Sequence, residues 1–259
     1  MAFVETGNAR LYWQADGERS LPALMFLNSL GTGTGMWDGV VDELKTEFHI
    51  IRADTRGHGR SQVAPGDYSM EMLAADALAV LDAAGLDKAH ICGLSMGALV
   101  ASHMAVRHRS RVNRLVLCNI VTEVNFPDWE QRATLVRESG MEAIADAVIS
   151  RFFSPAFIES GDRRVSKTLA KLKATDPEGY AACCIAVGKA EVLPASLGSN
   201  PPALLSIGGA HDTAAPEEHA RRIAASVASG RLAILETGHL SATEDPAGFS
   251  KALRSFLNG

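Results

Sequence analysis

The feature that most constrains the fold is an alternation of short apolar runs with longer helix-like stretches. The apolar runs occupy residues 22–29, 49–54, 89–94, 112–119, 202–209 and 231–237. Nearly continuous apolar runs of this length are typical of strands buried on both faces of a parallel sheet. Earlier in the chain, Leu11 and Trp13 alternate with polar neighbours in residues 9–15. That alternation predicts a half-buried strand at the edge of the sheet.

Helix-like stretches separate these runs, at residues 36–45, 69–85, 96–108, 215–228 and 246–259. Strand alternating with helix predicts an α/β fold, with a mostly parallel sheet flanked by helices on both faces. Between residues 121 and 196 the alternation stops, and only helical pieces follow one another. We therefore expect a core of residues 1–120 and 197–259. Residues 121–196 should form an inserted helical cap over the C-terminal edge of the sheet.

Composition and charge narrow the class of protein. With 259 residues, 47% of them hydrophobic, the chain can bury one large α/β core or two small ones. A net charge of −5 argues against nucleic-acid binding. The first residues lack the pattern of a signal peptide and no apolar run is long enough to span a membrane, so we expect a cytoplasmic protein. The four cysteines have no metal-binding spacing and are expected to be buried thiols in a reducing compartment (Cys92, Cys118, Cys183 and Cys184).

A serine stands between two glycines where the apolar run 89–94 gives way to a helical pattern. The sequence Gly-Leu-Ser-Met-Gly at 93–97 fits G-x-S-x-G. On a sharp strand-to-helix turn, flanking glycines allow close backbone approach, and the hydroxyl of Ser95 stands exposed above the sheet. A serine that merely caps the helix would need only one glycine. The context therefore favours a nucleophile at Ser95.

A nucleophilic serine needs a base and an acid that orients the base. Of the eight histidines, His239 directly follows the last predicted strand, and Asp212 follows the strand before it. A crossover in a parallel sheet returns the chain to the same edge, so Ser95, Asp212 and His239 should emerge together. Glu123 is a second candidate for the acid. His58 lies at the same edge, but its flanking glycines indicate a structural loop.

An oxyanion hole needs two backbone donors near the nucleophile. One should be the N–H of Met96, the residue after Ser95, and the second that of Leu30 in the loop "NSLGTGTGMW". Losing one such donor typically costs a factor of about 10²–10³ in rate. Without the other catalytic residues, the glycines of this loop would predict only flexibility.

The residues quoted so far carry a family resemblance. The chain resembles the 3-oxoadipate enol-lactonases, α/β-hydrolases that open a lactone in the β-ketoadipate branch of aromatic catabolism. The matching stretches are residues 26–38, 52–101, 111–120, 140–155 and 208–216. The resemblance implies hydrolysis of 3-oxoadipate enol-lactone by a nucleophile, acid and base at Ser95, Asp212 and His239. It implies no metal and no organic cofactor.

The substrate-binding side chains should come from the cap. An enol-lactone carries a carboxylate, so a net-negative protein needs a local cation; Arg151 is our candidate, and a surface salt bridge is its alternative role. Trp129 and Phe152 are the aromatic candidates. Two departures from the family concern the substrate: Phe152 stands where relatives usually have Trp, and Gly188 begins a Gly-Lys pair where relatives tend to be acidic.

Other functions fit the same catalytic residues. A different carboxylesterase, another lactonase or a cofactor-free perhydrolase would share the fold and differ in the cap. A ligand sensor on a hydrolase scaffold would bind without turnover. In each case we expect a small lactone or ester as partner, anionic for the lactonase, and neither nucleic acid nor membrane. We expect a monomer or a small homo-oligomer.

Overall fold

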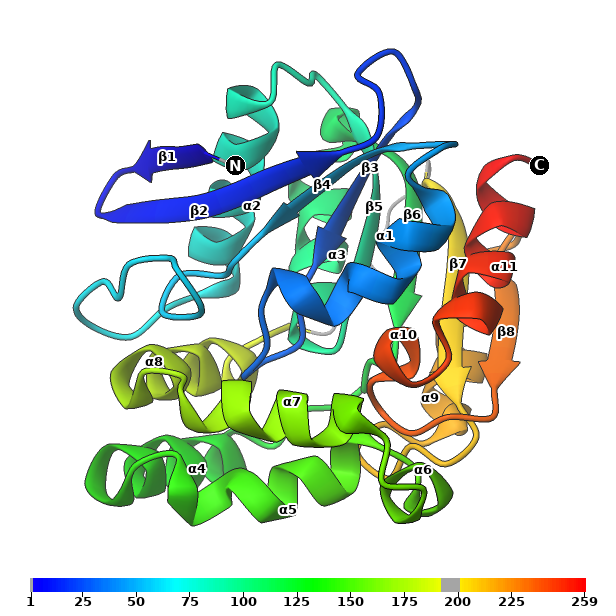
Figure 1. Cartoon of the computed structure of the whole chain (residues 1–259). Helices are drawn as coiled ribbons and strands as arrows, with labels where there is room; N and C mark the ends of the chain where they lie inside the picture. Colours follow the sequence, from blue (N-terminus) through cyan, green and yellow to red (C-terminus); the bar gives the residue numbers. More distant parts are fainter. Residues whose placement is uncertain (1, 192–200) are drawn as a thin grey trace.

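A single eight-stranded sheet organises the molecule (Figure 1). The computed structural model describes residues 2–191 and 201–259. The strand order is β1-β2-β4-β3-β5-β6-β7-β8, parallel from β4 to β8, with β1 and β2 antiparallel. The strands are β1 (Ala2–Thr6), β2 (Ala9–Asp16), β3 (Ala23–Leu27), β4 (His49–Ala53), β5 (Ala89–Leu94), β6 (Val112–Cys118), β7 (Ala203–Gly209) and β8 (Arg231–Leu235). Each of the six apolar runs contains one of the parallel strands, which confirms the predicted α/β class.

The prediction that residues 9–15 form an edge strand is wrong. Trp13 of β2 pairs with Ala53 of β4 on one side and with Ala2 of β1 on the other, so β1 is the edge. Alternation of polar and apolar residues indicates which face of a strand is exposed to solvent. It does not report whether another strand pairs beside it, and the short run of β1 was not recognised.

Helices cover both faces of the sheet (Figure 1). On one face, α1 (Asp38–Leu44) packs against α11 (Pro246–Leu257). On the other lie α2 (Met70–Ala83), α3 (Met96–Arg107) and α9 (Glu217–Ala225). Three short elements complete the core: η1 (Thr34–Trp37), η2 (Arg109–Arg111) and α10 (Ser241–Glu244). None of the described helices is both long and apolar enough to cross a membrane.

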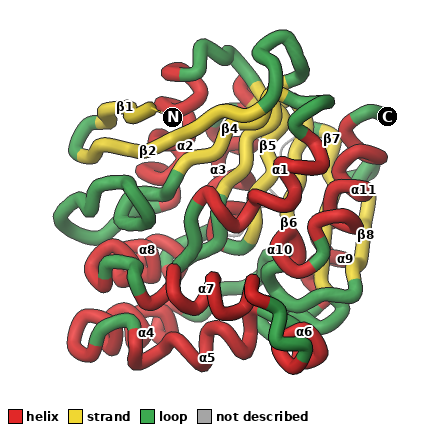
Figure 2. Tube along the Cα trace, in the orientation of Figure 1, coloured by secondary structure: helices red, strands yellow, loops and turns green. Residues whose placement is uncertain are grey.

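Five helices stand between β6 and β7: α4 (Phe126–Ser139), α5 (Glu142–Phe152), α6 (Pro155–Glu159), α7 (Arg163–Lys173) and α8 (Pro177–Gly188). They gather at the C-terminal edge of the sheet, where α4 packs on α8 and α5 on α7 (Figure 2). Residues 121–191 contain no strand. The short α6 was not predicted. The predicted boundary at residues 196 and 197 lies outside the described residues, so the division into core and cap stays a prediction.

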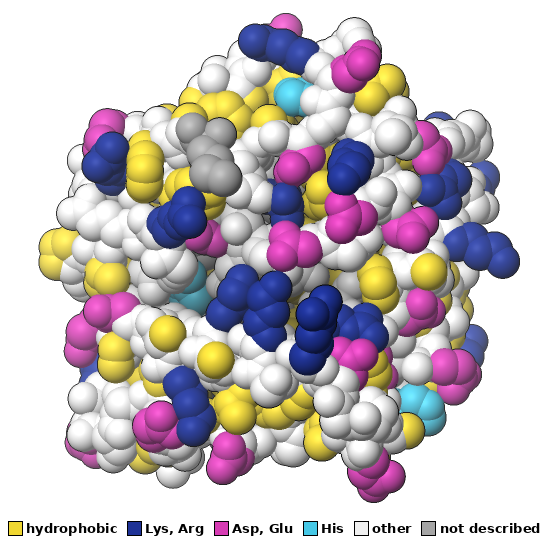
Figure 3. Space-filling view, in the orientation of Figure 1, with side chains coloured by type: hydrophobic (Ala, Val, Ile, Leu, Met, Phe, Trp, Pro, Cys, Tyr) yellow, Lys and Arg dark blue, Asp and Glu magenta, His cyan; other side chains and the backbone are white. Residues whose placement is uncertain are grey.

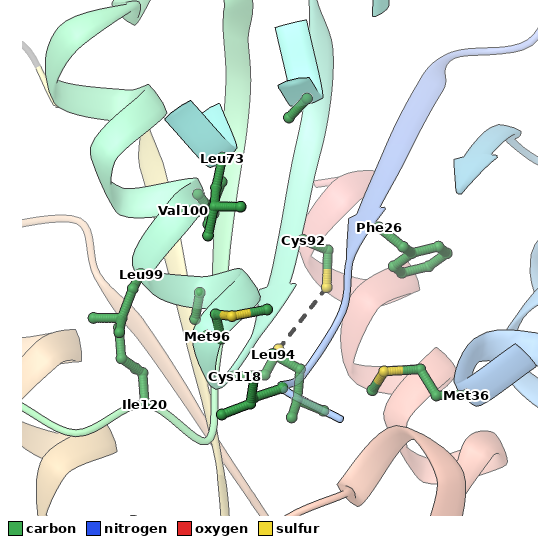
Figure 4. Packing of buried hydrophobic residues seen from close by; sticks show 14 of the residues in the cluster. Phe26, Met36, Leu73, Cys92, Leu94, Met96, Leu99, Val100, Cys118 and Ile120 are labelled. Carbon is green, nitrogen blue, oxygen red and sulfur yellow. Dashed lines mark hydrogen bonds between the residues drawn. The ribbon is translucent and has the colours of Figure 1, made fainter. Parts of the chain in front are cut away.

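The centre of the core is packed around β5 and β6 (Figure 4). The thiols of Cys92 and Cys118 lie 3.9 Å apart on these neighbouring strands, and all four cysteines are buried and free. Burial raises the pKa of the Cys118 thiol, so this side chain behaves as a small apolar group. Packing here fixes the ends of β5 and β6, from which the next residues of the chain emerge.

Candidate active site

Ser95 occupies a strained corner between β5 and α3. Its backbone angles are φ 56° and ψ −117°, and within the described residues only Asn119 shares a positive φ without being glycine. A residue held in such a conformation costs on the order of 1–3 kcal/mol, which the surrounding structure must supply. Part of that support is a hydrogen bond of 2.9 Å from the Ser95 N–H to the carbonyl of Cys118 on β6.

The glycines on either side of Ser95 are required by close backbone approach. A Cβ on Gly93 would collide with the carbonyl of Gly97, and a Cβ on Gly97 would collide with the carbonyl of Leu27 at the end of β3. The side chain of Ser95 makes no capping hydrogen bond to α3. The corner is therefore built as a nucleophile elbow is built, and its hydroxyl is not used to cap the helix.

Asp212 and His239 meet at the same edge of the sheet. Asp212 follows β7 and His239 follows β8, and the Nδ1 of the imidazole lies 2.8 Å from the Oδ2 of the carboxylate. The other carboxylate oxygen accepts hydrogen bonds of 2.8 Å from the N–H groups of Ala214 and Ala215. Both oxygens are thus held, and the ring of His239 is oriented by a fixed partner.

Asn119 completes this pair and was not predicted from the sequence. Its side-chain amide donates to Oδ2 of Asp212 at 3.0 Å, and its oxygen accepts from the hydroxyl of Ser241 at 2.6 Å. Burial alone would raise the pKa of Asp212, but the charge and hydrogen bond of His239, with those from Ala215 and Asn119, lower it. The carboxylate therefore stays ionised opposite His239. An asparagine directly after a strand, a residue type that tolerates positive φ, was the available signal.

The other candidate side chains lie elsewhere. Glu123 is exposed and forms a salt bridge of 3.3 Å with Arg222. His211, next to Asp212 in the chain, points to Glu236, with Nε2 3.2 Å from the carboxylate. His58 is buried in a loop after β4 and is not among the residues that line the cavity beside Ser95.

A cavity of about 220 Å³ opens above Ser95, between the sheet edge and the cap helices. Seven of the eight predicted site residues line it, and Asp212 lies behind His239. These seven are Ser95, His239, Leu30, Met96, Trp129, Arg151 and Phe152. Apolar side chains from core and cap form much of the remaining wall, including Leu99, Ile120, Val148 and Val187. In Figure 4, Met96 begins α3 directly after β5, Leu99 lies on the first turn of α3, and Ile120 follows β6; all three line the cavity.

Two aromatic residues of the cap are fixed by their neighbours. The ring of Phe152 lies nearly parallel to that of His239, with centroids 6.0 Å apart and 20° between the planes. Trp129 lies where α4 crosses α8 at Gly188. A Cβ on Gly188 would come within 2.9 Å of the Cβ of Trp129 and 2.8 Å of the Phe126 ring. The glycine that departs from the family pattern therefore permits close packing and sets the position of Trp129.

Two arginines reach the cavity, although only Arg151 was predicted. Arg132, half-buried on α4, lines it as well, and its guanidinium lies 4.8 Å from the ring of Trp129. Neither arginine forms a salt bridge with any described residue. The surface salt bridge considered for Arg151 is therefore not found among the described residues. Arg132 lies three residues after Trp129, so the two side chains share one face of α4.

The charge near the cap differs from the charge of the whole chain. Figure 3 shows lysine and arginine side chains gathered across the middle of this face. Arg164, Lys167 and Lys171 of α7 line a smaller cavity of about 110 Å³ beside the loop that follows β3. Positive charge is thus concentrated on part of this face although the net charge of the chain is −5.

Comparison with known proteins places the chain in a family. The alpha/beta hydrolase fold family matches residues 22–246. The 3-oxoadipate enol-lactonase 2 of Acinetobacter baylyi is 34% identical over 242 residues, which cover 93% of this chain and 90% of the relative. The crystal structure of the enol-lactonase from Burkholderia xenovorans LB400 superposes with a TM-score of 0.95 at 34% identity, covering 100% of both chains. A thermophilic, malate-bound esterase from Thermogutta terrifontis has a TM-score of 0.91 at 26% identity, covering 99% of this chain and 97% of that one. The chain is a hydrolase of the α/β-hydrolase family, and within that family it belongs to the 3-oxoadipate enol-lactonases.

Proposed function

We propose that this hydrolase opens 3-oxoadipate enol-lactone to 3-oxoadipate, with Ser95 as nucleophile, His239 as base and Asp212 as the orienting acid. The observation that carries the proposal is one cavity of about 220 Å³ that unites the hydroxyl of Ser95, the imidazole of His239 and two arginines without carboxylate partners among the described residues. A lactone that carries a carboxylate matches both features of the cavity: its ester group suits Ser95 and His239, and its carboxylate suits the two arginines.

The first half-reaction forms an ester with Ser95. His239 takes the hydroxyl proton as Oγ attacks the lactone carbonyl, and Asp212 stabilises the imidazolium that results. The N–H groups of Leu30 and Met96 receive the negative charge that develops on the carbonyl oxygen. In the part of the chain that the structure describes, neither of these donors binds another acceptor. Both are therefore available when the oxyanion forms.

Collapse of the tetrahedral intermediate breaks the ring C–O bond. The leaving oxygen belongs to an enol, which is stable as its anion. The imidazolium of His239 gives its proton to this enolate, which frees His239 to act as a base again. Because the leaving group is part of the same molecule, the acyl-enzyme retains every atom of the lactone. Water then attacks the ester as His239 removes its proton, Ser95 recovers the proton, and the product enol rearranges to the ketone.

Binding of the substrate carboxylate is assigned to Arg132 and Arg151. A guanidinium presents paired donors that fit a carboxylate, and removal from bulk water strengthens the attraction. The guanidinium of Arg132 lies over the ring of Trp129, which positions it. The preference for an anionic substrate, a cytoplasmic location and a monomer or small homo-oligomer are parts of this proposal. The four free cysteines support a reducing compartment.

The test is steady-state hydrolysis of the enol-lactone, followed by its ultraviolet absorbance, for the wild type and Ser95→Ala. We expect efficient turnover by the wild type and background rates for the variant. p-Nitrophenyl acetate serves as a neutral comparison substrate. Its hydrolysis without lactone turnover would replace the lactonase by a general esterase. Tight binding of ligand without turnover of either substrate would indicate a sensor.

A further inference from the structure

His58 is a buried histidine that the proposed mechanism does not use. It lies in the loop after β4 and is 1% exposed. Its Nε2 accepts a hydrogen bond of 3.0 Å from the backbone N–H of Gly31, and its Nδ1 lies 3.2 Å from the carbonyl oxygen of Arg56. Gly31 follows Leu30 directly, so His58 contacts the loop that carries one proposed oxyanion donor.

These two contacts fix the protonation state of the ring. A carbonyl oxygen can only accept, so Nδ1 must carry the proton that it donates to Arg56. The N–H of Gly31 can only donate, so Nε2 must present its lone pair. Burial lowers the pKa of His58, in agreement with a neutral ring. Protonation of Nε2 would set two N–H groups against each other and break the bond to Gly31.

The loop is held from the cap side by packing. Gly31 has φ +76°, and a Cβ placed there would lie 2.6 Å from Leu172 of α7 and 3.1 Å from the ring of Tyr180 on α8. Tyr180 also lines the cavity, and its ring centroid lies 6.4 Å from that of His58. The peptide between Leu30 and Gly31 is thus enclosed on one side by apolar groups. On the other side, the polar contact that this peptide makes with the described residues is the hydrogen bond from the Gly31 N–H to His58.

We propose that His58 is a positioning residue for the oxyanion hole, holding the peptide after Leu30 so that the Leu30 N–H faces the reacting carbonyl. The inference rests on the proposed function, because it assumes that Leu30 supplies a donor. An oxyanion donor acts only at the position that the oxygen occupies in the transition state, so rotation of the neighbouring peptide reduces the rate. Binding of the ground-state substrate does not depend on this contact. Loss of the contact should therefore lower kcat and leave KM nearly unchanged.

Two polar substitutions separate the two contacts of the ring. Gln places its amide oxygen near the position of Nε2 and can accept from Gly31, whereas Asn is shorter and reaches only the position of Nδ1. We expect His58→Asn to lower kcat by about 10- to 100-fold, at or below the loss of one whole donor, with KM within about threefold. His58→Gln should stay within about threefold of the wild type in kcat. Affinity for a small boronic acid, which forms a tetrahedral adduct with serine, should fall in parallel with kcat.

His49→Asn is the matched control. His49 is also buried, but it opens β4 at the opposite edge of the sheet, where its Nδ1 lies 3.4 Å from the carbonyl of Gly17. We expect this variant to lose thermal stability and to keep kcat within about twofold. Equal kcat values for His58→Asn and His58→Gln would overturn the inference, as would loss of thermal stability in His58→Asn without loss of boronic acid affinity. Ser95→Ala in the same series separates the claims: if it stays active, the proposed site itself is wrong.

Discussion

Replacing the two cavity arginines should separate recognition of charge from catalysis. Arg132→Met and Arg151→Met remove the charge and keep much of the apolar stem. Two unit charges 4 Å apart attract by about 1 kcal/mol in water and about 4 kcal/mol at the effective dielectric of a protein surface. Arg132 is half-buried and Arg151 exposed. We therefore assign about 2 kcal/mol of binding energy to Arg132 and about 1 kcal/mol to Arg151. The first value lies within the usual range for hydrogen bonds to charged groups, and the second lies below it.

These energies convert to about a 30-fold loss of kcat/KM on the enol-lactone for Arg132→Met and about a fivefold loss for Arg151→Met. The assay compares each variant on the anionic lactone and on neutral p-nitrophenyl acetate, at low and raised ionic strength. The loss should be confined to the lactone and should shrink as salt rises, because salt screens the attraction. If both arginines hold one carboxylate, their effects will not add in the double variant.

Arg137→Met is the control on the same helix. Arg137 pairs with Asp67 and Glu178 at the surface and does not line the cavity beside Ser95. It should stay within about twofold of the wild type on both substrates. An equal loss on the lactone and the neutral ester in Arg132→Met would mean that the substitution disturbs the fold of the site. Full lactone activity in both cavity variants would refute anchoring of the carboxylate by these arginines.

Three further predictions concern the corner, the acid and the cap. Asp212→Asn should lower kcat by about 10³–10⁴, measured on the lactone. Folding lowers the pKa of Asp212, so its contribution to stability is present above the unfolded pKa of about 3.9 and is lost as the pH falls through the folded pKa. The urea midpoint should therefore fall more steeply with acid in the wild type than in this variant. Ser95→Gly should unfold at a temperature about 2–4 °C above Ser95→Ala, because glycine relieves about 1 kcal/mol of strain at φ 56°; equal melting temperatures would count against strain at the corner. Gly188→Ala should raise KM for the lactone several-fold by displacing Trp129, and an unchanged KM would show that α4 and α8 absorb the extra methyl group.

Features that depend on local pattern could be predicted from the sequence. The apolar run at β5 and the two glycines around Ser95 indicate a buried strand and a sharp turn without reference to the rest of the chain. Asp212 and His239 could be placed because chain order and parallel topology bring successive strand ends to one edge. β1 was missed as the edge strand because its pairing with β2 does not change the alternation of polar and apolar residues in β2.

Features that depend on distant contacts could not be predicted in this way. Arg132 looks like any solvated charge on a polar helix until the orientation of α4 against the cavity is known. Asn119 gains its role from Asp212, 93 residues away in the chain. His58 was interpreted as part of a structural loop because its bond to Gly31 joins two loops after different strands. In each case a side chain acquires its function through a partner that sequence spacing does not specify.

The most direct test of the central claim, attack by Ser95 on the lactone carbonyl, is the mass of the enzyme quenched in acid during turnover. Opening of a ring loses no leaving group, so the peptide that contains Ser95 should gain the full mass of the lactone, and Ser95→Ala should show neither the adduct nor turnover. Turnover by Ser95→Ala at the wild-type rate, or an adduct on another residue, would contradict the assignment.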